Sequence, residues 1–320
     1  MSVRDMSSKM KIDKKYLELA RKQFCLDISM DWAEYQKNPN QMCYITKTVY
    51  SEDSNFPAAA GARCYEGKDS FFKAVMCMGQ LFMSVDEQIY DWAVETFQNY
   101  APEWFCEYSN LRRIDEKLME YGRCIADTHV YYLPKAQESK EDVLEDIPLI
   151  GGIEGSKDGY VVAKRRSQIP TIWYEQDEIL RFQEANRFKS AICFSKTQPD
   201  MLAVAAWNSR AHFEAREMAI LQGSNKTFDQ SKLSGMAGVS ADGEYLWQIG
   251  INVDKEHQGK GLAAELVSML KEEIIRRGKV PFYGTSESHT VSQTVALKAG
   301  FVPAWTEIYV KKLDSAVIEK

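Results

Sequence analysis

Long apolar runs are missing from this sequence. No window approaches ~18 uninterrupted apolar residues, and Arg4, Asp5 and Lys9 lie where a signal peptide has its apolar centre. These absences argue against a membrane-spanning helix and against secretion. We therefore expect a cytoplasmic protein with no membrane partner.

Paired cysteines and an excess of positive charge are also lacking. The seven cysteines include no Cys-x-x-Cys pair, and their odd number argues against a disulfide framework, so we expect reduced thiols and no metal site. The formal net charge of −6 comes from mixed signs and supplies no basic field for nucleic acid. Any anion that this protein binds must therefore meet positive charge at a local site.

The length of the chain favours two domains. It has 320 residues, of which 45% are hydrophobic, so a sizeable core is available. The segment 135–146 is rich in Lys, Glu and Asp and lies between Pro134 and Pro148, which favours a boundary there. We expect a smaller α/β domain over residues 1–145 that packs against a second α/β domain over residues 146–320.

The first 145 residues mix helical and strand patterns. Apolar spacings predict a helix over 12–36, and the apolar run 71–85 is interpreted as one buried strand, after which Asp86 caps a helix to about residue 100. A further helix opens at Asn110 or Asp115 and ends at Gly122, and short strands are predicted at 44–50, 60–65 and 129–133.

No catalytic motif is found in this part. His129 lies among Val130, Tyr131 and Tyr132 in its predicted strand, and we interpret it as a structural histidine. In the second part a helix is predicted over 178–188.

Two strands, 201–207 and 233–239, precede the central motif. The segment 210–231 between them is longer than a hairpin loop, and is interpreted as either a functional cover over a site or an inert insertion.

The most informative stretch is 245–278. Its first part alternates apolar and other residues up to Asp254, as a strand with two different faces does. From Leu262 the apolar period changes to that of an amphipathic helix, which Gly278 closes. Between strand and helix lies a turn that contains Gly259 and Gly261.

A strand, a glycine-containing turn and a helix form an anion site when the turn leaves the first N–H groups of the helix accessible. Gly259 and Gly261 let the backbone approach a phosphate, and Gln258 and Lys260 add a donor and a charge. An isolated Gly-x-Gly is also compatible with a tight turn that binds nothing. The third glycine of a dinucleotide fingerprint and the Ser or Thr of a P-loop are both missing.

The residues around this turn resemble the GNAT (GCN5-related N-acetyltransferase) superfamily. Gln258, Gly261 and Ala263 fill the positions of its motif A, and the run 289–301, which ends in Lys-x-Gly-Phe, resembles motif B. The resemblance covers about residues 202–311. The run 236–242 before the strand and the Tyr-Gly-Thr run 283–285 after the helix resemble a bacterial subgroup.

The resemblance implies an α/β (α+β) GNAT acyl-CoA fold, with a central mixed sheet at the C-terminus and acetyl-CoA as cofactor. The pantetheine arm would then lie along the central strand and the pyrophosphate on the turn. An amide N–H near Gly250 or Ile251 would face the thioester oxygen. The implied cofactor residues are Ile251, Asn252, Val253, Gln258, Gly259, Lys260, Gly261, Leu262, Ala263, Ala264 and His289.

The usual acid of the family is missing. A Tyr normally follows a motif B Asn by seven residues, and here these positions hold Ala296 and His289. His289 is therefore a candidate for the cofactor contact or for the proton donor, and Tyr283 is a second candidate acid. The candidate carboxylate bases are Asp242, Glu244 and Glu287, with Asp242 ahead because Ser240 can orient its short side chain by a hydrogen bond.

Two functions are compatible with this sequence. One is an acetyl-CoA-dependent N-acetyltransferase that acts on a small-molecule amine by direct attack, as a monomer or a homodimer, with residues 1–145 forming one wall of the acceptor cleft. The other is a non-catalytic acyl-CoA-binding sensor that has kept the turn and lost the acid.

Overall fold

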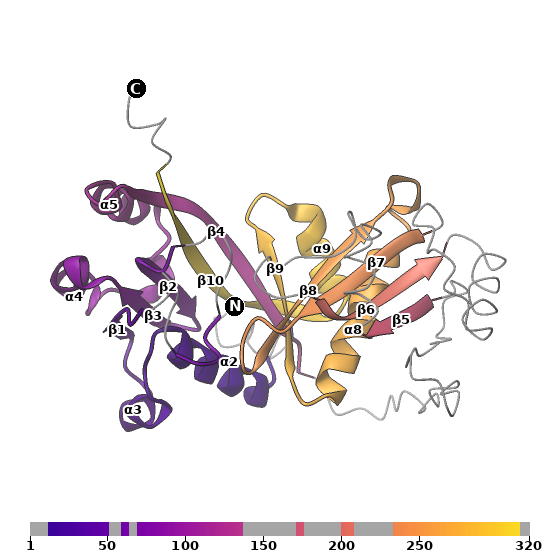
Figure 1. The fold of residues 1–320 in the computed structure, drawn as a ribbon, viewed down its shortest axis with the longest axis horizontal. Coiled ribbons are helices and arrows are strands. Elements are labelled where there is room, and N and C mark those ends of the chain that lie inside the picture. The colour runs from indigo at the N-terminus through magenta and orange to yellow at the C-terminus, as the bar shows by residue number, and fades with distance from the viewer. Residues whose placement is uncertain are drawn as a thin grey trace, which may run out of the picture.

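The computed structural model describes residues 12–50, 59–63, 69–136, 171–175, 200–207 and 233–313 (Figure 1). Within them no helix is long and apolar enough to cross a membrane. The α-helices are α2 (Lys14–Asp27), α3 (Trp32–Lys37), α4 (Tyr90–Phe97), α5 (Tyr108–Met119), α8 (Leu262–Arg276) and α9 (Thr290–Lys298). Short 3-10 helices are η1 (Glu87–Ile89), η2 (Pro102–Trp104) and η4 (Lys255–His257).

The described strands form one mixed sheet, in the order β1-β3-β2-β10-β4-β9-β8-β7-β6-β5. Two neighbouring pairs, β1 with β3 and β8 with β9, are parallel, and the remaining pairs are antiparallel. The bounds are β1 (Cys43–Lys47), β2 (Phe72–Cys77), β3 (Gln80–Val85), β4 (Arg123–Pro134), β5 (Thr171–Glu175), β6 (Asp200–Trp207), β7 (Leu233–Ser240), β8 (Leu246–Val253), β9 (Val280–Ser286) and β10 (Phe301–Lys312). The fold is therefore mixed α/β around a large mixed sheet, as expected.

The two halves of the sequence interlock in this sheet. The C-terminal strand β10 lies between β2 and β4, and β4 lies between β10 and β9 (Figure 1). The long strands β4 and β10 run side by side through the middle of the molecule. The division into units 1–145 and 146–320 stays a prediction, and most of its boundary, 137–146, lies outside the described residues. Separating the chain at this boundary would take β4 away from β10 and β9, the two strands of the second half with which it pairs.

Each face of the sheet is covered by its own helices. On one face α8 packs on β6 to β9, and its Leu266, Leu270 and Ile274 join Trp247 and Ile249 of β8 in one buried cluster. On the other face α2 buries an aromatic cluster against the middle of the sheet, formed by Phe24, Phe82, Phe282 and Trp305. A third cluster lies between the β2–β3 hairpin and the helices α4 and α5.

The elements around the central motif are confirmed. β8 begins at Leu246 and α8 ends at Arg276, with Gly278 following at a φ of 78°. β6 and β7 also form where the periodicities predict them, and α9 lies within the run 289–301 that resembles motif B. The carboxylate of Asp86 accepts a hydrogen bond from the backbone of Gln88 and caps the helical segment η1–α4, as predicted.

The single strand predicted over 71–85 is wrong, because this run is the hairpin β2–β3. Met78 and Gly79 form its two-residue turn, with φ values of 48° and 75°. Positive φ at both central residues defines the turn that suits the twist of a hairpin. The continuous apolar character remains, since most side chains of both strands are buried in the sheet.

Other boundaries also differ from the prediction. The helix predicted over 12–36 is two helices, because Ser29 takes a φ of 56° and Asp31 caps α3 through the N–H of Ala33. Residues 60–63 form a turn and an extended end rather than a strand, and α5 begins at Tyr108. The predicted helix 178–188, the segment 210–231 and residues 64 and 65 of the predicted strand lie outside the described residues.

Candidate functional site

The two parallel strands β8 and β9 separate in the middle of the sheet. Their register runs from Leu246 with Val280 to Ile249 with Tyr283 and ends there. β8 continues beside β7 to Val253, and β9 continues beside β4 to Ser286. A gap therefore opens between residues 250–253 of β8 and residues 284–286 of β9, and an extended ligand can lie in it like a strand.

The glycine-containing turn lies at the open end of this gap. Gly259 and Gly261 have φ values of 75° and 86°, in the left-handed region that favours glycine, and a Cβ at either position would point into open space. Gly261 is the N-cap of α8, so no side chain at this position caps the first N–H groups of the helix. The exposed turn therefore presents the N-terminus of a 15-residue helix to solvent, which is an arrangement that favours an anion.

The polar side chains of the turn fold onto their own backbone. The amide of Gln258 donates to the carbonyl oxygen of Val253 at 3.0 Å, and the ammonium group of Lys260 donates to that of Glu256 at 2.9 Å. These bonds shape the turn and place the side-chain nitrogen of Lys260 beside it. The structure thus brings together the predicted residues 251–253 and 258–264.

Thr285 adds a polar atom that the sequence did not single out. Its side chain is 3% exposed, and its hydroxyl oxygen has no hydrogen-bond partner among the described residues. Leaving a buried hydroxyl without a partner costs about 1–3 kcal/mol, so such a group usually meets a ligand or water. Thr285 lies on β9 two residues beyond Tyr283, along the gap.

Tyr283 is the last residue of β9 that pairs with β8, and it faces the α8 side of the sheet. Its hydroxyl lies 2.9 Å from the hydroxyl of Ser292 on α9. Burial raises the pKa of Tyr283 above its ordinary value of about 10, so the group stays protonated at neutral pH. A tyrosine hydroxyl therefore lies beneath α9 although the helix itself carries Ala296.

The two motif B positions differ in exposure. His289 is the exposed N-cap of α9, where its side chain makes no capping bond, and Ala296 is fully buried in the cluster beneath the helix. His289 follows β9 by three residues. Among the described residues no group of three or more His, Cys, Asp and Glu is arranged to hold a metal ion.

Asp242 and Glu244 lie in the turn between β7 and β8, before the central strand. The expected hydrogen bond is present, because the hydroxyl of Ser240 donates to Asp242 at 3.0 Å. Glu244 is exposed and lies 3.5 Å from the ammonium group of Lys279. From the start of β8 to Gly250, four residues at about 3.3 Å each span about 13 Å, so the structure does not bring these carboxylates to the gap.

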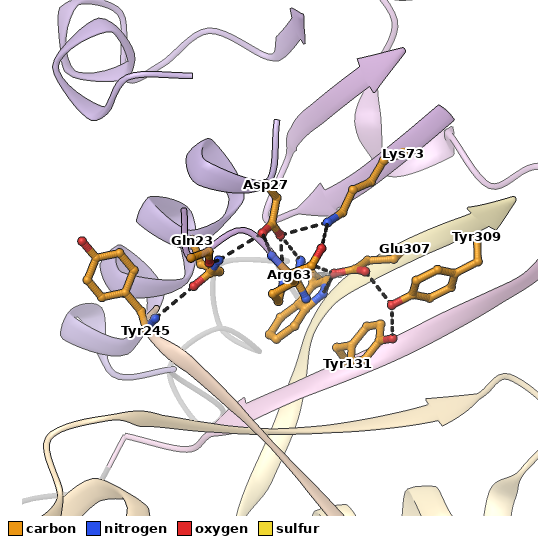
Figure 2. A network of polar contacts seen from close by, with 10 residues as sticks. Gln23, Asp27, Arg63, Lys73, Tyr131, Tyr245, Glu307 and Tyr309 are labelled. Atoms are coloured by element: carbon orange, nitrogen blue, oxygen red, sulfur yellow. Dashed lines mark hydrogen bonds and ion pairs between the residues drawn. The ribbon is translucent and has the colours of Figure 1, made fainter. Parts of the chain in front are cut away.

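The turn that holds both carboxylates is attached to α2. The side-chain oxygen of Gln23 accepts the N–H of Tyr245 at 2.9 Å, and its amide donates to the carbonyl oxygen of Gly61 and to Asp27. A Cβ on Gly243 would lie 2.5 Å from Gln23, so this close approach requires glycine. Figure 2 shows Gln23 between Tyr245 and the buried charges around Arg63.

These charges form a network beneath β10 (Figure 2). The guanidinium group of Arg63 lies 2.6 Å from Asp27 and 2.5 Å from Glu307, and Lys73 lies 3.3 Å from Asp27. Glu307 also accepts hydrogen bonds from Trp305 and from Tyr309, and the Tyr309 hydroxyl contacts that of Tyr131. The network joins α2, the segment 59–63 and β10, and ends at β4 beside the gap.

The sequence 240–310 matches the family described as FR47-like protein. No curated protein matches the chain. A GNAT-family acetyltransferase from Colwellia psychrerythraea is 12% identical over 95% of this chain and 99% of its own, with a TM-score of 0.32. A GCN5-related N-acetyltransferase from Sphaerobacter thermophilus is 13% identical over 75% and 76%, with a TM-score of 0.34.

These solved structures are too distant to carry an argument about the site. The family assignment depends instead on the FR47-like match, which spans β8, the glycine turn, α8, β9 and α9. The motif A and motif B residues lie in this region, around the separated strands β8 and β9. The FR47-like match supports GNAT superfamily membership for this C-terminal part.

Proposed function

We propose that the protein transfers an acetyl group from acetyl-CoA to the amine of a small molecule, by direct attack in a ternary complex. The observation that carries this proposal is the gap between β8 and β9, with the N-terminus of α8 at its open end. The buried hydroxyl of Thr285, which has no hydrogen-bond partner within the described part of the chain, supports it, since an extended amide-containing ligand in the gap would supply one.

The residues fit this cofactor in two regions. Backbone groups of Ile251, Asn252 and Val253 would hold the pantetheine arm by strand-like hydrogen bonds, so their geometry matters more than their side chains. The pyrophosphate would lie on residues 258–264, where the N–H groups of the first helical turn and the charge of Lys260 favour an anion. His289 at the start of α9 is proposed as a further contact.

Acetyl-CoA supplies the acetyl group as a reactive thioester. An N–H near Gly250 or Ile251 would stabilise the negative charge that develops on the carbonyl oxygen. The hydroxyl of Tyr283, protonated because burial raises its pKa, would donate a hydrogen bond to the departing sulfur. Asp242 and Glu244 stay candidate bases, although the distance along β8 argues against direct contact with the acceptor.

The test combines binding and turnover. We expect calorimetric titration to show CoA binding, and acetyl-CoA with a panel of primary amines to release free thiol only when an amine is present. CoA binding without thiol release for any amine would favour the acyl-CoA sensor instead. Absence of CoA binding to the folded protein would overturn both functions.

Replacing Tyr283 with Phe should lower kcat by ~10-fold or more and leave the CoA affinity nearly unchanged, because the donor to the sulfur is lost while the ring remains packed. Since the pKa of Tyr283 is raised, kcat/KM of the wild type should show no falling limb from this tyrosine below about pH 10.

Ser292→Ala, which removes the hydroxyl partner of Tyr283, is the matched variant. It should lower kcat less than Tyr283→Phe does. Equal activity of Tyr283→Phe and the wild type would exclude Tyr283 as the acid.

A further inference from the structure

One face of the sheet beside the gap is built from small and polar residues. Antiparallel register partners share a face, so Tyr131 lies beside Gly284 and His129 beside Ser286. This is the face that α2 covers farther along, at Leu246 and Phe282. Near the gap α2 no longer covers this face. His129 and Ser286 are half-buried there, and Asn252 of β8 is exposed.

Nothing bulky on β9 separates β4 from the gap on this face. The ring of Tyr131 packs so closely on Gly284 that a Cβ there would lie 2.5 Å from it. The next residue on this face is Ser286, the register partner of His129. His129 is therefore one strand spacing, about 4.8 Å, from the strand that borders the gap, across the two smallest side chains of β9.

His129 is held in a defined orientation. Its Nδ1 lies 3.0 Å from a carboxylate oxygen of Asp127, two residues earlier on the same face. The ring packs edge-on against Tyr309 at 5.7 Å and beside Tyr131 at 6.1 Å. When Asp127 accepts the proton of Nδ1, the neutral ring carries its lone pair on Nε2, which is the form that a base needs.

We propose that His129 is the catalytic base for the acceptor amine and that Asp127 is its positioning residue. This proposal rests on the N-acetyltransferase function proposed above. Nε2 of His129 takes one proton from the ammonium group, and the neutral nitrogen then forms the new C–N bond to the acetyl carbon as the C–S bond breaks. The leaving sulfur takes the hydroxyl proton of Tyr283, so that CoA leaves as the thiol, and the proton that the new amide nitrogen loses restores the Tyr283 hydroxyl through water. His129 returns its own proton to solvent.

This assignment gives the first half of the chain a role in the chemistry. β4 belongs to residues 1–145, yet it pairs directly with β9 at the gap. The network of Figure 2 holds β4 in place. Glu307 accepts a hydrogen bond from the hydroxyl of Tyr309 at 2.7 Å, and this hydroxyl contacts that of Tyr131 on β4. A primary amine, which arrives as an ammonium ion, would also meet the partly exposed carboxylate of Asp127.

The experiment compares two nucleophiles with acetyl-CoA. Spermidine carries protonated alkylamines at pH 7.5, whereas hydroxylamine is already neutral and needs a base less. We expect His129→Gln to lower kcat/KM for spermidine by ~100-fold and that for hydroxylamine by less than ~5-fold, with CoA affinity unchanged. Asp127→Asn donates its amide to Nδ1 and so moves the ring proton to Nε2, and it should cause a similar selective loss.

Glu87→Gln, which removes one charge of the exposed ion pair with Lys47, is the control and should retain both rates. NMR of the imidazole nitrogens in the CoA complex, at a pH where the ring is neutral, should show the proton of His129 on Nδ1. Equal losses for both nucleophiles, unchanged spermidine turnover in His129→Gln, or a proton on Nε2 in the wild type would each overturn the proposal. A wild type that binds CoA but acetylates neither nucleophile would overturn the proposed function itself.

Discussion

Replacing Arg63 with Met should lower the free energy of unfolding by about 3–5 kcal/mol, because it leaves buried carboxylates without their main partner. Arg63, Asp27 and Glu307 are almost fully buried, and with Lys73 they form a set of two cations and two anions. The guanidinium carbon of Arg63 also lies 5.3 Å from the ring centroid of Phe24 and 5.7 Å from that of Trp305, and Met places an uncharged apolar side chain beside these rings. Urea denaturation at pH 7 measures the difference.

The pH dependence of the free energy of unfolding shows whether charge causes the loss of stability in Arg63→Met. Burial alone would raise the pKa of Asp27, but Arg63 and Lys73 outweigh it and hold the pKa below the ordinary value. A lowered pKa contributes stability above about pH 4 that is lost as the pH falls through the folded-state pKa. In Arg63→Met this contribution is gone, so the stability difference from the wild type should shrink as the pH falls below about 4.

Lys47→Met is the matched control, because it breaks the 2.7 Å ion pair with Glu87 at the surface. Solvent screens such a pair, so the midpoint of denaturation should stay nearly constant. A pH-independent loss in Arg63→Met would point to packing instead of charge. No loss at all would show that the network contributes nothing to stability.

Local patterns predicted the central motif because each element there has its own periodicity. The alternation along β8 and the i+4 steps of α8 depend on neighbouring residues only, and both elements form within one or two residues of the prediction. The turn at Gly259 and Gly261 was found for the same reason. The hairpin turn at Met78 was missed because no polar residue marks it within an apolar run.

The position of β4 could not be predicted from such patterns. Its pairing with β9 joins His129 to Ser286 across almost half of the chain, and no local signal encodes a partner at that distance. His129 was therefore interpreted as a structural histidine. The burial of Arg63 was missed for the same reason, since its partners are Asp27 and Glu307. The Asp127–His129 spacing of two was a readable signal for one face of a strand.

Gly261→Asp should weaken CoA binding by ~1000-fold. The new carboxylate would lie at the N-terminus of α8, where the pyrophosphate is proposed to bind. Two like charges about 4 Å apart cost about 4 kcal/mol at an effective dielectric constant near 20, which corresponds to that factor in affinity. Calorimetric titration of the folded variant with CoA measures it.

Gly261→Asn is the matched control for Gly261→Asp. Asn has nearly the same shape and tolerates the left-handed φ of 86° better than most residues, so both variants carry similar backbone strain and differ in charge. We expect Asn to weaken CoA binding by ~10-fold or less. The difference in CoA affinity between the two variants should become smaller at high salt, because mobile ions screen exposed charges. Equal losses of CoA affinity in both variants would show that backbone shape, not charge, causes the effect. Unchanged CoA affinity in Gly261→Asp would show that the phosphate does not bind at this turn.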